Sequence, residues 1–243
     1  MPVRAAALAA ALAAGCRDPA AGPGKLSGVD RLPAYRVARA AGPIEIDGRL
    51  DEPAWGAALQ MPLVVSLTGA PPRHPTVARV LRDERHLYLA FDCRDDQVFV
   101  RSGRQHDDPI HEDEVVEVFL DPAGTGRDYV EIEVSPAGVI FDARFESWRS
   151  DLGRARAWES GAVAAAWIDR GPAGDRGWTV ELRVSMDELR GTARPPRPGS
   201  RWRANLYRLE THNRAGEVEG QAFSPPYHGD FHALDRFGWL LFD

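Results

Sequence analysis

The chain has 243 residues and a formal net charge of −6 at pH 7, from 36 acidic and 30 basic side chains. Because phosphate binding depends on clustered Lys and Arg, this balance disfavours nucleic acid as a partner. The hydrophobic fraction of 44% and the seven tryptophans are enough for the core of one large domain. Neither a metal nor a disulfide is therefore required for stability.

Residues 1–16 have the features of a secretory signal peptide. They carry a basic Arg4, an Ala/Leu run too short to span a bilayer, and the ending Leu12-Ala13-Ala14-Gly15-Cys16. Because the small residues end in a cysteine, the segment resembles a bacterial lipobox. This resemblance predicts a lipid on Cys16, export to the cell envelope (periplasmic or outer-membrane anchored), and membrane contact only through that lipid. Plain secretion and a chance Ala-rich cytosolic start are the alternatives.

The rest of the chain divides into a tether and one domain. Residues 17–33 are rich in Pro, Gly and Ala with little apolar periodicity, which predicts a flexible tether. Residues 34–243 carry short alternating runs punctuated by Gly and Pro, which predict an all-β, antiparallel β-sandwich with a few short helices. The longest helix candidate is 185–190, with Ser185 as its N-cap. Cys93 lies in a strand-like run, where a free thiol is usually a small buried hydrophobe, and a disulfide to an unacylated Cys16 is the alternative.

Two β-rich runs, residues 111–122 and 129–138, flank a Gly-containing turn and predict an antiparallel hairpin. Since strand side chains alternate, the aliphatic residues of the second run share one face, and Tyr129, Glu131 and Glu133 share the other. The first face is expected in the core. The second can hold a hydroxyl-rich ligand or a cation, although antiparallel sheets commonly leave such a face solvated, and that is the expectation here.

The same hairpin resembles the centre of the family 9 carbohydrate-binding modules. Further segments that resemble this family, in its order, are 46–55, 81–91, 177–186, 205–208 and 231–242. The resemblance covers roughly residues 44–243. It implies a β-sandwich that binds sugars without hydrolysing them, often as an appendage of glycan-degrading enzymes, with structural calcium in some members.

The resemblance also implies a set of binding residues. Family members that grip the reducing end of a glycan clamp the sugar between two tryptophans, but the matching segments here, 110–111 and 223–227, contain none. An aromatic face suits the C–H side of a pyranose, and charged groups suit its hydroxyls. By motif position the candidate residues are His111, Glu117, Arg144, Asn205, Phe223 and Tyr227. We expect Glu117 and Arg144 to lie on one exposed face within reach of a single sugar, walled by His111 and Tyr227.

Three further expectations concern metals and catalysis. Asp92, Asp95 and Asp96 offer carboxylates at a density that suits structural calcium, without EF-hand spacing, and an exposed turn is the alternative. The acids of the central hairpin are numerous enough for a glycoside hydrolase, but a sequence gives no carboxyl separation, so a non-catalytic protein is expected. A haem-binding sandwich, with Met61 or Met186 and a histidine as axial ligands, is a second alternative.

His228 and His232 are four residues apart, a spacing that places two ligands on one face of a helix. The prolines and the glycine of the segment 225–229 argue against a helix there, so the four-residue spacing does not indicate a pair of metal ligands. We expect both histidines to form hydrogen bonds within a loop.

Overall fold

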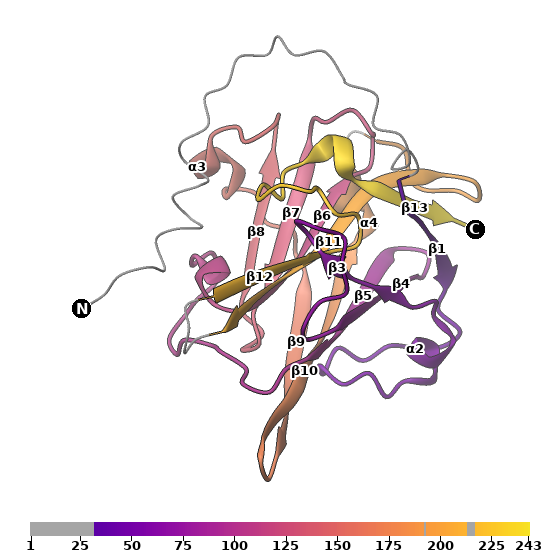
Figure 1. The fold of residues 1–243 in the computed structure, drawn as a ribbon. Helices are drawn as coiled ribbons and strands as arrows, with labels where there is room; N and C mark the ends of the chain where they lie inside the picture. Colours follow the sequence, from indigo (N-terminus) through magenta and orange to yellow (C-terminus); the bar gives the residue numbers. More distant parts are fainter. Residues whose placement is uncertain (1–31, 192, 213–216) are drawn as a thin grey trace.

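The computed structural model describes residues 32–191, 193–212 and 217–243 (Figure 1). Cys16, the leader and nearly all of the expected tether lie outside the described residues. Within the described ranges, no helix is long and apolar enough to cross a membrane.

The described residues form thirteen strands and five short helical segments. The strands are β1 (Ala34–Arg39), β2 (Met61–Pro62), β3 (Val64–Val65), β4 (Thr76–Arg82), β5 (His86–Arg94), β6 (Val115–Asp121), β7 (Tyr129–Val134), β8 (Ile140–Phe145), β9 (Val163–Gly171), β10 (Gly174–Ser185), β11 (Arg201–His212), β12 (Glu217–Ala222) and β13 (Gly238–Phe242). The helical segments are α2 (Pro53–Ala57), η1 (Ile110–Glu112), α3 (Leu152–Ala155), α4 (Met186–Arg190) and η2 (Leu234–Arg236). The predicted helix is α4, where Ser185 caps the N-terminus by accepting a 3.2 Å hydrogen bond from the Asp187 N–H.

The strands pack as a β-sandwich, as predicted. The first sheet has the order β8-β7-β6-β11-β13-β1, with β12 and β3 attached through β11, and the second has the order β1-β4-β5-β10-β9, with β2 on β4. Strand β1 belongs to both sheets, because residues 34–37 pair with β13 and residues 38–39 pair with β4. These two pairings are parallel, whereas the other strand pairs are antiparallel.

The central hairpin of the first sheet is β6–β7. Asp121 ends β6, and its carboxylate accepts hydrogen bonds from the N–H groups of Gly124 at 2.8 Å and Gly126 at 2.7 Å. Both glycines have positive φ, of 67° and 70°, which a side chain disfavours. The resulting turn fixes a register in which Glu117 lies opposite Glu133.

The main core lies between the two sheets. Alternate aliphatic residues of β6, β7 and β11 form one buried cluster with residues of β5 and β10, such as Phe91 and Trp178. Cys93 belongs to this cluster and is fully buried, as expected of a small hydrophobe. Burial of such side chains contributes roughly 1.5–3 kcal/mol each.

The outer face of the first sheet, which points away from the second sheet, is also covered. Phe119, Tyr129 and Tyr207 form a second buried cluster there with Ala222 of β12 and Phe237 of the C-terminal segment. In Figure 1, β12 and the yellow C-terminal segment cross in front of β6, β7 and β11. The expectation of a solvated outer face is therefore wrong, because segments distant in sequence pack over it and leave Tyr129, Glu131 and Glu133 buried.

Candidate ligand-binding pocket

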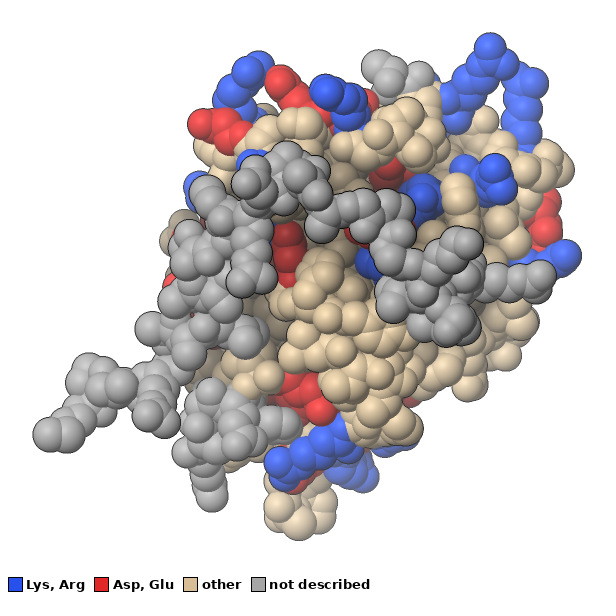
Figure 2. All heavy atoms as spheres, turned by 45° about the horizontal axis from the view of Figure 1, so that its top comes forward, with Lys and Arg blue, Asp and Glu red and all other residues tan. Residues whose placement is uncertain are grey.

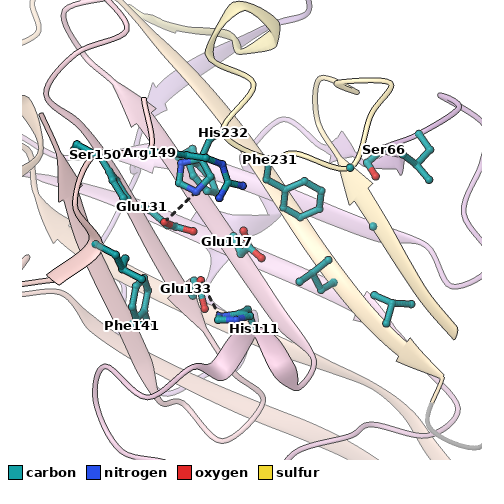
Figure 3. Close-up of a pocket in the computed structure, with 18 of the residues that line it drawn as sticks. Ser66, His111, Glu117, Glu131, Glu133, Phe141, Arg149, Ser150, Phe231 and His232 are labelled. Carbon is teal, nitrogen blue, oxygen red and sulfur yellow. Dashed lines mark ion pairs between the residues drawn. The ribbon is translucent and has the colours of Figure 1, made fainter. Parts of the chain in front are cut away.

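A cavity of about 460 Å³ opens on the outer face of the first sheet. Its floor consists of carboxyl and aromatic side chains from three adjacent strands. These residues are Glu117 and Phe119 of β6, Glu131 and Glu133 of β7, and Phe141 and Phe145 of β8. Figure 3 shows the three carboxylates of the floor pointing toward one another.

The walls come from segments that are distant in sequence. His111 of η1 lies at one end, and Phe231 and His232 of the C-terminal segment lie on the opposite side with Arg149 (Figure 3). Phe231 stacks on Tyr207 with ring centroids 4.0 Å apart and an angle of 7° between the rings. The wall approaches β12 closely at Gly220, where a Cβ would lie 3.0 Å from the Phe231 Cζ. A side chain at Gly220 would therefore displace this wall.

Strand register brings the three carboxylates together. Glu117 pairs across the ladder with Glu133, and Glu131 pairs with Phe119, so these side chains project from the same face. One carboxylate oxygen from each of the three glutamates lies within 4.8 Å of the other two. Their side chains are buried, with between 3% and 7% of each residue exposed.

Burial dominates the acid–base behaviour of this floor. It raises the pKa of Glu117 and of Glu133 well above the usual range, and the negative charges of neighbouring glutamates raise them further. Burial also raises the pKa of Glu131, to about 7. Glu131 is the most acidic of the three because a hydrogen bond with Glu133 and the positive charge of Arg149 stabilise its carboxylate. At neutral pH the floor therefore holds protons that ordinary glutamates would have lost.

The basic side chains beside the floor do not neutralise it. Arg149 donates to both carboxylate oxygens of Asp230, with Nη2 2.7 Å from Oδ1. His232 lies 3.8 Å from Glu131, but burial and the charge of Arg149 lower its pKa to about 4, so the ring is neutral at pH 7. The Nδ1 of His232 shares a 2.7 Å hydrogen bond with the Tyr129 hydroxyl.

One acceptor on the floor is unsatisfied. The Oε2 atom of Glu133 is buried and has no hydrogen-bond partner among the described residues. The Nδ1 of His111 lies 4.0 Å from the other oxygen, too far for a hydrogen bond, so the interactions of the Glu133 carboxyl are those with Glu131 and with the His111 backbone N–H. An unpaired buried oxygen of this kind is costly, and a ligand donor that reached it would relieve that cost.

Of the six residues predicted from sequence, His111 and Glu117 line the cavity. Arg144 does not, and the expectation that it shares a face with Glu117 is wrong. It pairs with Val130, whose side chain lies in the core between the sheets, whereas Glu117 projects from the outer face. Arg144 instead forms a 3.0 Å ion pair with Asp128 and lies over the Trp158 ring. The expected exposure is also wrong, because Glu117 is buried.

The remaining three predicted residues do not line the cavity. Asn205 is fully buried, and its Nδ2 donates to the Tyr207 hydroxyl at 2.6 Å and to the Ser224 carbonyl at 2.7 Å. Phe223 packs against the core between the sheets. Tyr227 is 46% exposed, and Arg236 lies over its ring.

The three aspartates predicted for calcium do not converge. Asp95 is buried and forms a 2.7 Å ion pair with Arg208, while the Asp96 side chain is 75% exposed. Asp92 points away from the core because its strand neighbour Cys93 points into it. Within the described ranges, three groups of acidic or histidine residues bring ligand atoms within 4.8 Å of one another, and none unites these aspartates.

The cavity also contains residues that the sequence interpretation did not assign to the site, among them Glu131 and Glu133 of the floor and Phe231 of the wall. The alternation of β7 indicated that both glutamates share a face, but not that the face is covered. Met61 and Met186, the candidate haem ligands, are buried in the core between the sheets and do not reach the cavity. The His228 ring accepts a 3.2 Å hydrogen bond from the Asp230 N–H within the loop, as predicted, whereas the His232 ring bonds to Tyr129 of β7 and only its backbone N–H bonds within the loop.

The fold and the cavity together define a β-sandwich domain with a buried acidic pocket on one face. The sequence profile of the family described as "Carbohydrate family 9 binding domain-like" matches residues 46–199, more than half of the chain. The chain belongs to this family. No curated protein matches it in sequence.

Solved structures share the fold at low sequence identity. A candidate carbohydrate-binding protein from Bacteroides uniformis ATCC 8492 is similar with a TM-score of 0.65 and 17% identity, over 86% of this chain and 99% of that one. A family 9 carbohydrate-binding module from Caldicellulosiruptor kristjanssonii, in complex with cellotriose, has a TM-score of 0.59 and 16% identity, over 87% and 94%. Its complex with glucose has a TM-score of 0.57 and 16% identity, over 86% and 96%.

Proposed function

We propose that this protein is a non-catalytic carbohydrate-binding protein that holds a sugar in the pocket on the outer face of the first sheet. The observation that carries the proposal is a cavity with a floor of hydrogen-bonding carboxyls and walls of aromatic rings, in a domain of the carbohydrate family 9 type. The complexes of the structurally similar module with cellotriose and glucose support it.

The cavity has the chemistry that sugar binding requires. Its volume of about 460 Å³ lies within the range of small-molecule sites, roughly 300–1,000 Å³. Phe141, Phe145 and Phe231 supply apolar ring surface against which the C–H groups of a pyranose can pack. The carboxyls of the floor can accept hydrogen bonds from hydroxyls and, where protonated, donate to them.

The placement of the acids favours binding over hydrolysis. A glycosidase needs two carboxyls that flank the scissile bond, about 5–5.5 Å or 6.5–9.5 Å apart. Here Glu117, Glu131 and Glu133 project from one sheet face with oxygens within 4.8 Å of one another. Asp151 lines another part of the cavity, but its carboxylate caps α3 by accepting a 2.8 Å hydrogen bond from the Arg154 N–H.

The charge distribution agrees with a ligand other than nucleic acid. On the face shown in Figure 2, acidic and basic side chains of the described residues are interspersed, and these residues form no continuous basic surface in that view. The lipid anchor predicted at Cys16 is part of the proposal, with the membrane contacted through that lipid alone. Mass spectrometry of the protein from its native membrane fraction tests it, and a mature chain that keeps Met1 or begins after Cys16 contradicts it.

Titration calorimetry and affinity gels with the full chain and a glycan panel test the proposed function. We expect binding to at least one glycan, and a loss of roughly five- to a hundredfold in affinity for Glu117→Gln, which replaces a floor oxygen that can accept a hydrogen bond by an amide nitrogen that can only donate one. Glu112→Gln is the matched control, because Glu112 is exposed, pairs with Arg101 and Arg104, and does not line the cavity. Absence of binding across the panel contradicts the proposal, and release of reducing sugar favours the hydrolase alternative.

Calcium stays a prediction for this chain. A site that exists only in the folded state would stabilise it by RT ln(1 + [Ca²⁺]/Kd). Thermal melts with millimolar calcium and with a chelator measure this effect. An unchanged melting temperature would contradict the prediction that the folded protein binds calcium.

A further inference from the structure

The pocket contains more acid than a neutral sugar needs. Sites for neutral hydroxyl groups combine donors and acceptors, whereas this floor presents three carboxyls. Of the basic side chains in the described lining, Arg149 pairs with Asp230, and burial lowers the pKa values of His111 and His232. We propose that the pocket selects a sugar that carries a primary ammonium group, such as a 2-amino-2-deoxyhexose at the end of a deacetylated glycan. This inference rests on the proposed function and names the substrate class of the same site.

The geometry of the floor matches an ammonium group. Glu117, Glu131 and Glu133 each place one oxygen within 4.8 Å of the other two, so a single atom between them can approach all three. An ammonium group has three N–H donors and no acceptor. It can therefore donate one hydrogen bond to each glutamate, and the unpartnered Oε2 of Glu133 is an acceptor available to it.

No arginine among the described lining residues forms an ion pair with a glutamate of the floor. Arg149 is held by Asp230 through two N–H donors, Nε and Nη2, and His232 is neutral because its pKa is lowered to about 4. A ligand with a positive charge would supply the paired cation that Arg149 and His232 do not provide to the floor carboxylates. Hydrogen bonds between charged partners are roughly twice as strong as those between neutral ones, so the ammonium group should dominate selectivity.

The aromatic rings of the floor favour an organic cation over a metal ion. Calcium needs six to eight oxygen ligands, and beyond the carboxyls this floor offers the aromatic rings of Phe119, Phe141 and Phe145. Aromatic faces attract ammonium groups and pack against sugar C–H bonds. The volume of about 460 Å³ also exceeds what an ion alone would fill, so the cation should carry a bulky body.

Binding of an ammonium group should release protons. The positive charge favours the ionised form of the carboxyls, whose pKa values are raised in the free protein. Affinity should therefore rise with pH through about 7, where Glu131 ionises, until the ligand amine loses its proton. The other titratable or charged groups that border the floor or its neighbours are His111, Tyr129, Arg149, Asp151, Tyr207, Asp230 and His232.

The experiment compares three sugars that differ only at carbon 2, namely glucose, glucosamine and N-acetylglucosamine. Calorimetry with the full chain should show that glucosamine binds about tenfold or more tightly than either neutral sugar. Proton release should appear as a dependence of the observed binding enthalpy on the ionisation enthalpy of the buffer. In Glu131→Gln the ratio of glucosamine affinity to glucose affinity should fall toward one. Glu112→Gln should keep the wild-type preference, because it alters an exposed acid outside the cavity.

Each other outcome overturns the inference. Equal affinity for glucose and glucosamine refutes the amine selection and leaves the proposed function intact, whereas no binding of any sugar refutes both. A preference that a chelator abolishes would identify a metal site instead. If ethylamine alone binds as tightly as glucosamine, the pocket recognises an amine without its sugar, and the substrate class is wrong.

Discussion

Two clusters of buried acids lie on opposite faces of the first sheet, and they differ in how their charge is balanced. Between the sheets, the Arg208 guanidinium lies 2.7 Å from Asp95, 3.5 Å from Glu114 and 3.4 Å from Glu210. On the outer face, the three glutamates of the pocket floor have no comparable cation. The residues of the first cluster do not line the cavity that the second cluster borders.

The contrast separates a structural cluster from a ligand site. A buried acid that is paired holds segments in place, and removal of its partner leaves a costly buried charge. A buried acid without an ion-pair partner at a cavity lowers the stability of the fold. Such groups are common at functional sites, where a ligand can bind them. The four predictions below test this contrast, from the largest expected effect to the smallest.

Arg208→Met should destabilise the protein by about 3–5 kcal/mol, because it removes the cation and leaves several buried acids without it. Denaturant unfolding at pH 7 measures the free energy of unfolding. Arg36→Met is the matched control, since the Arg36 side chain is 67% exposed and its ion pair with Asp243 is long, at 3.5 Å. We expect less than about 1 kcal/mol for the control. An equally small effect for Arg208→Met would show that the inner cluster does not depend on its cation.

Glu131→Gln should have the opposite effect on the free energy of unfolding and stabilise the ligand-free protein at pH 8. The pKa of Glu131 is about 7 in the folded state against a usual value of 4.5, so the folded state binds more protons between these values. Stability from this group is fully present below about 4.5 and is lost as pH rises to about 7. Gln does not titrate, so the variant should gain up to about 3 kcal/mol over wild type across that window.

Melting curves of wild type and Glu131→Gln from pH 4 to pH 8 measure this difference. We expect it to grow with pH, and Glu112→Gln, at an exposed acid, should show no such growth. A constant difference, or a variant that is less stable than wild type at pH 8, would mean that ionisation of Glu131 does not destabilise the folded protein.

The strand pattern of the sequence predicted much of the floor, but not its environment. Alternation in 129–134 placed Glu131 and Glu133 on the face opposite the core, which is confirmed. That this face is buried depends on Phe231 and Phe237, about one hundred residues later in the chain. Such long-range packing leaves no signal within the strand itself.

Arg144 shows how a motif match can override a local pattern. In the run 140–145, alternation groups Arg144 with Ile140 and Asp142, and the structure places these residues on the inner face. The family resemblance instead grouped Arg144 with Glu117, and that grouping is wrong. The resemblance identified the β-sandwich correctly, because a fold tolerates changes at single positions that a binding site does not.

Asn205→Ala should lower stability by about 1–3 kcal/mol, because the side chain is fully buried and holds the Ser224 backbone through hydrogen bonds at 2.7 and 2.9 Å. Since Asn205 does not line the cavity, ligand affinity should fall much less than in Glu117→Gln. Unfolding and calorimetry on the same sample measure both effects. A loss of affinity without a loss of stability would place Asn205 in direct contact with the ligand.

Arg144→Ala should have the smallest effect on binding, because Arg144 projects from the inner face and the pocket lies on the outer one. Its contacts are the ion pair with Asp128, a hydrogen bond to the Glu188 carbonyl and the Trp158 ring. Loss of these partly exposed contacts should cost about 1 kcal/mol of stability. Affinity for the best ligand should stay within about threefold of wild type, a change of less than 0.7 kcal/mol. A larger loss of affinity with unchanged stability would show that the ligand reaches the face between the sheets. The pocket assignment would then be wrong, although the difference in charge balance between the Arg208 cluster and the three floor glutamates would remain.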